Sequence, residues 1–258
     1  MIDLHCHLLP GVDDGAPDMA RAVELAALSV AGGISHAVLT PHVYPGVWDN
    51  TPESLQPAFQ AFRESLLAAG VPLELTLGGE VRLLPECLEQ ADRGALPTIG
   101  QWEGYRVLLL EFPDGQIPVG TDNAVAYLRD RGYLPMIAHP ERNRAVMTDP
   151  SKIAPLLEAG CLMQLTAASV IGGFGARVQR TALQMLDAGI VTVVATDAHN
   201  VAHRPPRLAE ARAFLEERYG AEPADALTRT MPAKIIGHEC TIAPGVAAGD
   251  PAPEPVIR

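Results

Sequence analysis

The chain has 258 residues, 48% of them apolar, and a formal net charge of −12, which together predict one folded domain with a sizeable core. The excess of acidic residues argues against a nucleic-acid-binding protein, since phosphate backbones are held by clustered lysines and arginines. Four cysteines without paired spacing argue against a disulfide framework or a cysteine zinc site. The lack of a long apolar run or a leader peptide predicts a cytoplasmic protein without membrane insertion.

The chain opens with a short apolar strand that carries two histidines. His5 and His7 are two positions apart, and the side chains of a strand alternate between its faces, so both imidazoles point the same way. This pair predicts metal ligands at the end of the first element. Asp13, Asp14 and Gly15 follow and are typical of a turn.

Helices and strands alternate along the rest of the chain. Apolar residues at helical spacing predict helices over residues 17–33, 53–69, 122–132, 152–160, 176–189, 207–219 and 223–230. Short apolar runs predict further strands over residues 35–42, 73–80, 106–113, 134–139, 162–166 and 190–197. Residues 81–100 fit neither pattern. Residues 241–258, where Pro, Gly and Ala are frequent, are expected to form a flexible tail.

The order of these elements predicts one α/β domain over residues 1–240 with parallel strands. Side chains of metal-ligand type fall at the C-terminal ends of most predicted strands: His5, His7, His42, Glu80, Glu111, His139, Asp197 and His199. A closed barrel brings all of its strand ends to one rim, whereas an open sheet gathers a site at one crevice. We therefore predict a TIM-like barrel.

The types of these side chains predict a metal centre. Each residue alone has an ordinary explanation, such as a surface loop for His42 or a helix cap for Glu111, but this many at strand ends are hard to explain that way. Imidazoles and carboxylates without thiolates suit manganese, iron or zinc, and more than four ligands require more than one ion. A carboxylate such as Glu80 can bridge two ions about 3.5–4 Å apart, which suits phosphoryl transfer.

The same residues stand in motifs that resemble a known superfamily. The motifs are His5-x-His7 and residues 9–15, 40–42, 79–82, 110–112, 138–143, 164–169, 173–175 and 197–200, followed by Arg204. They resemble the polymerase-and-histidinol-phosphatase (PHP) superfamily, and more narrowly its bacterial manganese-dependent protein-tyrosine phosphatases of capsule and exopolysaccharide systems. The resemblance covers residues 1–220. It implies a distorted seven-stranded (β/α)7 TIM-like barrel, the PHP fold, as a single domain.

The resemblance also implies three divalent metal ions, with manganese first and iron or zinc as alternatives. It assigns His5, His7, Glu80 and Asp197 to the first ion, Glu80, Glu111 and His139 to the second, and Asp14, His42 and His199 to the third. Asp14 separates the tyrosine-phosphatase branch from many relatives that have a histidine there. Arg142 and Arg204 match the family's phosphate-binding arginines, and planar guanidinium groups suit phosphate oxygens.

The implied activity is that of a phosphoric monoester hydrolase, with phosphotyrosine hydrolysed by a metal-activated hydroxide. Arg142 and Arg204 would bind the phosphoryl group and stabilise its charge. Asp14 or His199 would protonate the leaving group if it is not fully engaged as a metal ligand. Tyr44 and Trp48, in the loop after His42, are suited to pack around the aryl ring or the peptide of the substrate. The alternative is that this loop only covers the barrel. In this family the substrate is often the tyrosine-rich tail of a cognate bacterial tyrosine kinase of polysaccharide biosynthesis. An oligomer is compatible with the sequence.

Other functions stay open at this point. The substrate could be a small phosphomonoester, such as histidinol phosphate or a sugar phosphate, because nothing in the rim residues excludes it. An amidohydrolase barrel also opens with two histidines, but it commonly uses a carboxylated lysine on a mid-barrel strand, and Lys152 and Lys234 lie on none. A degenerate, non-enzymatic barrel is disfavoured because every ligand position is filled.

One pair of residues in the sequence suggests a second kind of phosphatase chemistry, which would use a cysteine nucleophile. Cys87 and Arg93 have the C-x5-R spacing of cysteine-dependent phosphatases. Such a loop needs backbone N–H groups curled around phosphate, usually with the help of glycine. The segment between the two residues has no glycine, is acidic and favours a helix, so we do not expect a phosphate-binding loop there.

Overall fold

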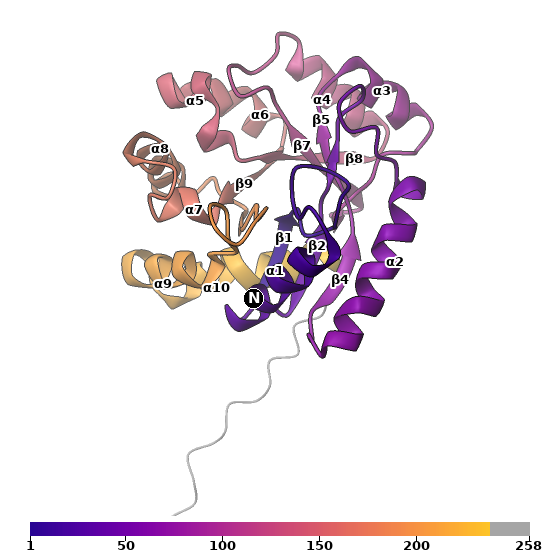
Figure 1. Cartoon of the computed structure of the whole chain (residues 1–258). Helices are drawn as coiled ribbons and strands as arrows, with labels where there is room; N and C mark the ends of the chain where they lie inside the picture. The colour runs from indigo at the N-terminus through magenta and orange to yellow at the C-terminus, as the bar shows by residue number, and fades with distance from the viewer. Residues whose placement is uncertain (238–258) are drawn as a thin grey trace, which may run out of the picture.

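A computed structural model describes residues 1–237, whose strands lie at the centre with the helices around them (Figure 1). The strands are β1 (Ile2–Cys6), β2 (His36–Leu39), β3 (His42–Val43), β4 (Glu74–Leu77), β5 (Glu80–Arg82), β6 (Gly100–Trp102), β7 (Tyr105–Glu111), β8 (Tyr133–Ala138), β9 (Leu162–Thr166) and β10 (Val193–Ala195). The helices are α1 (Met19–Ala31), α2 (Pro52–Ala69), α3 (Pro85–Asp92), α4 (Thr121–Asp130), α5 (Arg144–Thr148), α6 (Ala154–Glu158), α7 (Ala167–Val170), α8 (Ala176–Asp187), α9 (Leu208–Tyr219), α10 (Ala221–Asp225) and α11 (Met231–Ile236). The tail predicted over residues 241–258 lies outside the described residues.

The strands pair almost entirely in parallel, as the alternation of strands and helices predicts. One sheet has the order β1-β2-β4 and the other has the order β10-β9-β8-β7-β5-β3, while β6 pairs with β7 in the antiparallel direction. A parallel bridge between Cys6 and Ala198 joins the end of β1 to the segment after β10. The predicted α/β class is confirmed. None of the helices within residues 1–237 has the length and apolarity that a membrane span needs.

The strand predicted over residues 35–42 is divided into β2 and β3. Pro41 lies at the break, and because proline has no N–H it cannot donate to the ladder. His42 therefore begins β3, whereas the sequence placed it at the end of a longer strand. The N–H of His42 donates to Oδ2 of Asp13 at 3.0 Å. This hydrogen bond connects the start of β3 to the loop that follows β1.

The strand predicted over residues 73–80 is divided in the same way into β4 and β5. Gly78 and Gly79 lie at the break, and a Cβ on Gly79 would lie 2.6 Å from Cγ of Pro97. Glycine at this position allows a close approach that a side chain would prevent. Glu80 therefore begins β5 rather than ending a strand, and it is buried.

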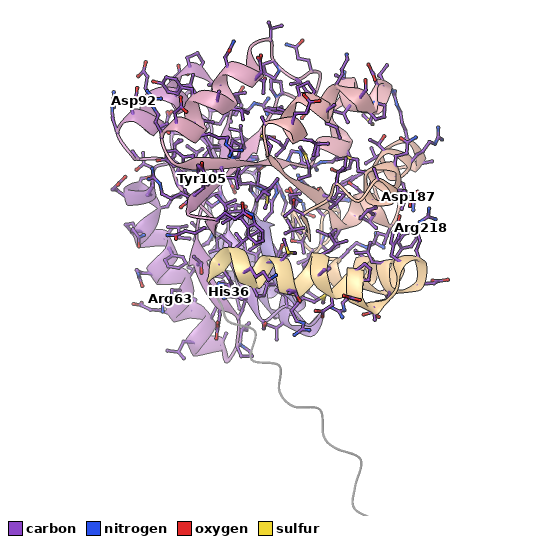
Figure 2. All side chains as sticks on the ribbon, turned by 180° about the vertical axis from the view of Figure 1, so that it is seen from behind. His36, Arg63, Asp92, Tyr105, Asp187 and Arg218 are labelled. Carbon is purple, nitrogen blue, oxygen red and sulfur yellow. The ribbon has the colours of Figure 1, made fainter. Side chains whose placement is uncertain are left out.

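Alternate residues of the central strands pack into two apolar clusters. On β7, Leu108 and Leu110 belong to one cluster, whereas Val107 and Leu109 belong to the other, which also contains Ile235 of α11. Both faces of β7 are buried, which is why the strand reads as a continuous apolar run. Figure 2 shows the molecule from behind, with the yellow C-terminal helices running across its lower part.

The sequence does not predict the short elements. Helices α3, α5, α7 and α11 have eight residues or fewer, which is too short for helical periodicity to show. The helix predicted over 152–160 is observed as a 3₁₀ turn (Pro150–Ile153) followed by α6. The helix predicted over 223–230 is observed as α10 followed by a π-helical turn (Ala226–Thr230). The last predicted strand, 190–197, shortens to β10.

Candidate metal centre

The predicted metal ligands meet at one pocket of ≈ 420 Å³. Seven of them line it: Asp14, His42, Glu80, Glu111, His139, Asp197 and His199. The remaining two, His5 and His7, are fully buried in β1 and directly after it. Arg142 and Arg204 line the same pocket. The structure therefore brings together every metal ligand and both phosphate-binding arginines that the sequence predicts.

Ligand atoms of these residues form four overlapping groups, and within each group they lie within 4.8 Å of one another. The groups are His5–His7–Glu80, His5–His139–Asp197, His42–Glu80–Glu111 and His7–Asp14–His42–His199. Four residues each belong to two groups: His5, His7, His42 and Glu80. Shared ligands are what a cluster of several neighbouring ions requires.

The innermost contacts place two imidazoles and two carboxylates around one small space. Nε2 of His5 and Nε2 of His7 lie 3.2 Å apart. Nε2 of His5 also lies 3.3 Å from Oε2 of Glu80 and 3.4 Å from Oδ1 of Asp197. Nε2 of His7 lies 3.3 Å from the same oxygen of Glu80. Nitrogen and oxygen donors that converge in this way are suited to hold a cation.

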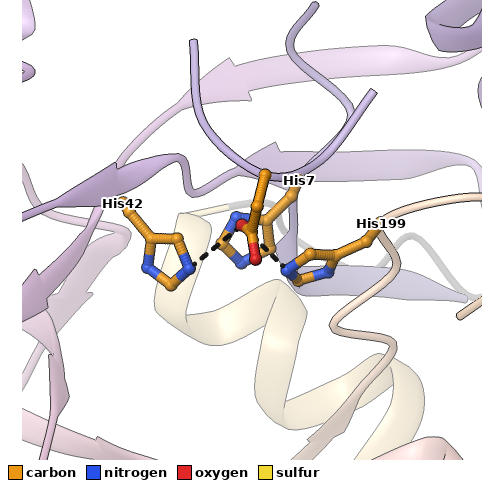
Figure 3. Close-up of side chains that lie close together, drawn as sticks. His7, His42 and His199 are labelled. Carbon is orange, nitrogen blue, oxygen red and sulfur yellow. Dashed lines mark ion pairs between the residues drawn. The ribbon is translucent and has the colours of Figure 1, made fainter. Parts of the chain in front are cut away.

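The carboxylate of Asp14 lies close to two further imidazoles, those of His42 and His199. Its Oδ1 lies 3.3 Å from Nε2 of His42 and 3.4 Å from Nε2 of His199. Figure 3 shows His42 and His199 on either side of His7, and the ring centroids of His7 and His199 are 4.0 Å apart. The side chain of Asp14 is 47% exposed, so this set lies at the open side of the site.

Several buried atoms of the site have no hydrogen-bond partner among the described residues. They include Nδ1 of His42, Oε2 of Glu80 and Nε2 of His199. Nδ1 of His42 and Oε2 of Glu80 lie 3.1 Å apart but lack hydrogen-bond geometry. An orphaned buried polar group costs about 1–3 kcal/mol, and a metal ion would satisfy these atoms. The donor set of imidazoles and carboxylates fits manganese, iron or zinc.

Two histidines are held so that Nε2 faces the site. Nδ1 of His7 donates to Oδ2 of Asp13 at 2.7 Å, and Nδ1 of His5 donates to Oε1 of Gln164 at 2.9 Å. The N–H of His139 donates to the same Oε1 at 3.1 Å. Because these oxygens accept, each Nδ1 carries the hydrogen and each Nε2 is free to bind a metal. The sequence motifs contain Asp13 and Gln164 but give neither a role, since a positioning group resembles any polar residue of a turn or strand.

Replacing Asp13 by asparagine should weaken metal binding by about 10- to 100-fold. The carboxylate accepts from Nδ1 of His7, from the N–H of Gly15 at 2.9 Å and from the N–H of His42 at 3.0 Å, and an amide cannot accept from all three in this arrangement. The measurement is a competition for Mn²⁺ with a chelator of known affinity. Asp92→Asn, in an exposed carboxylate labelled in Figure 2, is the matched control. Unchanged affinity in Asp13→Asn would contradict the positioning role.

The charges of the site shift the pKa values of its members in different directions. Burial opposes the charged imidazole of His42, but the carboxylates of Asp14 and Glu80 raise its pKa to about 10. Burial and the neighbouring Glu80 raise the pKa of Glu111 to about 7. Burial and a neighbouring guanidinium lower the pKa of His139 to about 4. Metal ions would displace the proton of His42, because a ligand must be deprotonated to coordinate.

Arg142 and Arg204 both contact Asp197. Nη2 of Arg142 lies 2.7 Å and Nη2 of Arg204 lies 2.5 Å from Oδ2 of Asp197, whose Oδ1 faces His5. The guanidinium of Arg142 also lies 5.3 Å from the ring centroid of Phe174, which is a cation–π contact. One buried carboxylate, itself a candidate metal ligand, therefore contacts two guanidinium groups that line the pocket.

Tyr44 is not among the residues that line the pocket. Its ring centroid lies 5.1 Å from the guanidinium of Arg82, whose Nη1 is 2.9 Å from Oε2 of Glu111. The neighbouring Trp48 stacks on His42, with ring centroids 4.8 Å apart. Tyr44, by way of Arg82, and Trp48 therefore pack behind two candidate ligands, Glu111 and His42, from outside the pocket. A contact between Tyr44 and the substrate stays a prediction.

Cys87 and Arg93 do not form a phosphate-binding loop. The segment is helical from Pro85 to Asp92, as its composition predicts. Cys87 is 2% exposed, and burial raises the pKa of its thiol to about 12. Nη2 of Arg93 lies 3.9 Å from Oε2 of Glu89, one helical turn away. A protonated, buried thiol is a poor nucleophile.

The chain is similar to known proteins along most of its length. The chain matches a family model described as capsular polysaccharide synthesis, CpsB/CapC, over residues 1–237. It is 36% identical over 228 residues to the tyrosine-protein phosphatase YwqE of Bacillus subtilis, covering 88% of this chain and 89% of YwqE. It is 30% identical over 245 residues to the tyrosine-protein phosphatase CpsB of Streptococcus pneumoniae, covering 92% of this chain and 98% of CpsB.

Two solved structures are also similar to this chain, to different degrees. A structure from the pair YwqE of B. subtilis and CpsB of S. pneumoniae, described as unique metal-dependent tyrosine phosphatases, has a TM-score of 0.81 and 35% identity. The match covers 87% of this chain and 90% of that one. The phosphotriesterase homology protein of Escherichia coli has a TM-score of 0.55 and 12% identity, over 90% of this chain and 96% of that one. This second likeness is one of fold alone.

Proposed function

Since this chain belongs to the CpsB/CapC family of capsular polysaccharide synthesis, we propose that it is a metal-dependent protein-tyrosine phosphatase, a phosphoric monoester hydrolase acting on phosphotyrosine. The observation that carries the proposal is the convergence of four groups of imidazole and carboxylate ligands on a pocket that also contains two arginines. Phosphoryl transfer depends mainly on positioning and charge stabilisation, which metal ions and guanidinium groups supply together.

We assign the ligands to three divalent ions. His5, His7, Glu80 and Asp197 would hold one ion, Glu80, Glu111 and His139 a second, and Asp14, His42 and His199 a third. The spatial group of His7, Asp14, His42 and His199 contains the whole third set, which supports this division. Manganese is the first candidate, and iron or zinc would accept the same donors.

We infer further that the two sheets form one distorted seven-stranded barrel, within the single domain that the sequence predicts over residues 1–240, of which 238–240 lie outside the described residues. In this arrangement β2 with β3 counts as one strand, and β4 with β5 as another. The bridge between Cys6 and Ala198 supports closure of the ring. The N–H of Thr196 also donates to Oδ1 of Asp3 at 2.9 Å, which fastens β1 to the segment after β10.

The residues of the chain would divide the work of hydrolysis. Bound divalent ions would activate water for attack at phosphorus and offset the charge of the phosphoryl oxygens. Arg142 and Arg204 would turn N–H groups from Asp197 to the phosphoryl oxygens, because a guanidinium binds such oxygens through two parallel N–H groups. Asp14 or His199, at the open side of the site, would give a proton to the leaving phenolate only while it is not bound to the third ion, because a coordinated carboxylate or imidazole nitrogen carries no proton.

The substrate that we propose is a phosphotyrosine in the tail of a bacterial tyrosine kinase of polysaccharide biosynthesis, which would place the protein in the cytoplasm. The capsule family and the named activities of YwqE and CpsB support this substrate. An oligomeric state stays a prediction. Histidinol phosphate or a sugar phosphate is the competing substrate, and the experiment below separates it.

Removal and restoration of metal test the proposal. A chelator should abolish activity, because no other group of the site replaces the ions, and Mn²⁺ should restore it better than Mg²⁺, Zn²⁺ or Fe²⁺. We then expect kcat/KM for a phosphotyrosine peptide to exceed that for histidinol phosphate, or for a phosphoserine peptide of the same sequence, by at least about tenfold. A preference for histidinol phosphate would refute the substrate but not the site. Full activity after complete metal removal would refute the mechanism.

A further inference from the structure

Arg144 lines the same pocket but belongs to none of the groups described so far. It is the first residue of α5, and its side chain is exposed. The backbone beneath it is fixed, because its N–H donates to the carbonyl of Asp114 at 2.8 Å and the side chain of Asn143 accepts from the N–H of Ala145 at 3.0 Å. Arg144 therefore extends from a well-anchored position at the rim of the pocket.

The guanidinium of Arg144 differs from the other two in the pocket. Arg142 and Arg204 are both engaged by Asp197, at 2.7 Å and 2.5 Å. Within residues 1–237, no carboxylate lies within 4.0 Å of the Arg144 guanidinium, and its side chain makes no hydrogen bond. In a chain with a net charge of −12, this leaves an unpaired cation beside the candidate active site.

We propose that Arg144 binds an acidic side chain flanking the phosphotyrosine and so makes the enzyme prefer acidic phosphotyrosine sequences. This inference rests on the proposed phosphatase function. A phosphotyrosine side chain that reaches Arg142 and Arg204 leaves the peptide backbone at the rim, where Arg144 is exposed. Arg142 and Arg144 are two residues apart, so their Cα atoms are within about 7 Å. Neighbouring residues of an extended peptide are spaced by about 3.3 Å, which puts a residue one or two positions from the phosphotyrosine within reach.

Because Asp114 lies at the same rim, the preference for an acidic residue should depend on its position in the peptide. Its side chain is exposed at the same rim, and it forms no ion pair with Arg144. The rim of the pocket thus carries one positive and one negative side chain that are not paired with each other. An acidic residue should be favoured only at the flanking position that meets Arg144, and the preference should weaken as salt screens the pair.

The test uses metal-loaded protein and phosphotyrosine peptides that carry Asp, Asn or Lys at one flanking position at a time. Wild type should show a kcat/KM about two- to fivefold higher for Asp than for Asn at one or more positions, which is the range expected of an exposed ion pair. Arg144→Ala should remove this preference, and Arg144→Glu should invert it in favour of Lys. Hydrolysis of p-nitrophenyl phosphate, which has no flanking residues, should be the same in wild type and in Arg144→Ala.

The matched control is Arg177→Ala. Arg177 lies on α8, and its Nη2 donates to Oγ1 of Thr148 at 2.9 Å, so the variant removes a positive charge near α5 but outside the pocket. It should keep the wild-type preference. Equal rates of wild type on Asp and Asn peptides, or a preference that survives Arg144→Ala, would overturn the inference. So would a fall in p-nitrophenyl phosphate hydrolysis in Arg144→Ala, because Arg144 would then belong to the phosphate site. A metal-loaded wild type that is inactive on every aryl phosphate would instead refute the proposed function.

Discussion

Asp197→Asn is expected to lower kcat/KM for a phosphotyrosine peptide by about a thousandfold while the protein stays folded. The carboxylate of Asp197 is buried, contacts Arg142 and Arg204, and faces Nε2 of His5. Removing one group that stabilises charge in the transition state costs about 2.7–4 kcal/mol, and about 1.4 kcal/mol corresponds to a tenfold change in rate. A neutral amide can neither balance the two guanidinium groups nor replace the charge of a metal ligand.

Asparagine is the substitution that tests the charge of Asp197 and not its shape. Asp197 has a φ of 52°, a left-handed conformation that asparagine adopts more readily than most residues. The matched control is Asp187→Asn, which removes a carboxylate 3.1 Å from Nη2 of Arg218 at the edge of the molecule in Figure 2 and should leave the rate unchanged. Circular dichroism and thermal unfolding report the fold. An Asp197→Asn protein with more than about a tenth of wild-type activity would rule out the central role of this carboxylate.

Gly15→Ala is expected to lower kcat/KM by about a hundredfold, because it displaces ligands that must be placed precisely. A Cβ on Gly15 would lie 2.1 Å from the carbonyl oxygen of His7 and 2.6 Å from the Cβ of His7. The same carbonyl accepts from the N–H of Ala16 at 3.1 Å, so the loop is folded directly onto His7. An alanine must push the loop away, which moves Asp13 from Nδ1 of His7 and Asp14 from the metal ligands.

Gly115→Ala is the matched control for this change. A Cβ on Gly115 would meet nothing within 4 Å, so the variant adds the same methyl group without a clash. Metal content, measured by mass spectrometry of the digested protein, should be reduced in Gly15→Ala and normal in Gly115→Ala. A Gly15→Ala protein that carries its full complement of metal and turns over at the wild-type rate would show that the loop adjusts.

Most of the candidate metal ligands could be picked out from the sequence because they are imidazoles or carboxylates at the ends of predicted strands, although His42 and Glu80 begin strands in the structure. His139 and Glu111, for example, end long apolar runs, and parallel strands bring such ends together. The positioning residues could not be predicted in this way. Gln164 meets His5 across 159 positions of sequence, and only the folded chain shows which of many polar residues makes that contact.

In the fold, the long elements could likewise be predicted from the sequence, whereas the short elements could not. The apolar runs that became β7 and β8 were long enough to predict, since both faces of each strand are buried. Residues 81–100 contain α3 and the approach to β6, which are too short to produce a clear period. Pro41 was visible in the sequence, but its effect on the strand depends on the pairing of β2 and β3 with different sheets.

The link between Asp3 and Thr196 has a consequence for how the protein is made. The two residues are 193 positions apart, and the neighbouring candidate ligands His5 and Asp197 are almost as distant in the chain. Such a contact closes a very long loop and forms only after both ends are available. During synthesis, the first strand leaves the ribosome long before its partner exists. Metal loading, and with it catalysis, therefore has to wait until the chain has been translated past His199.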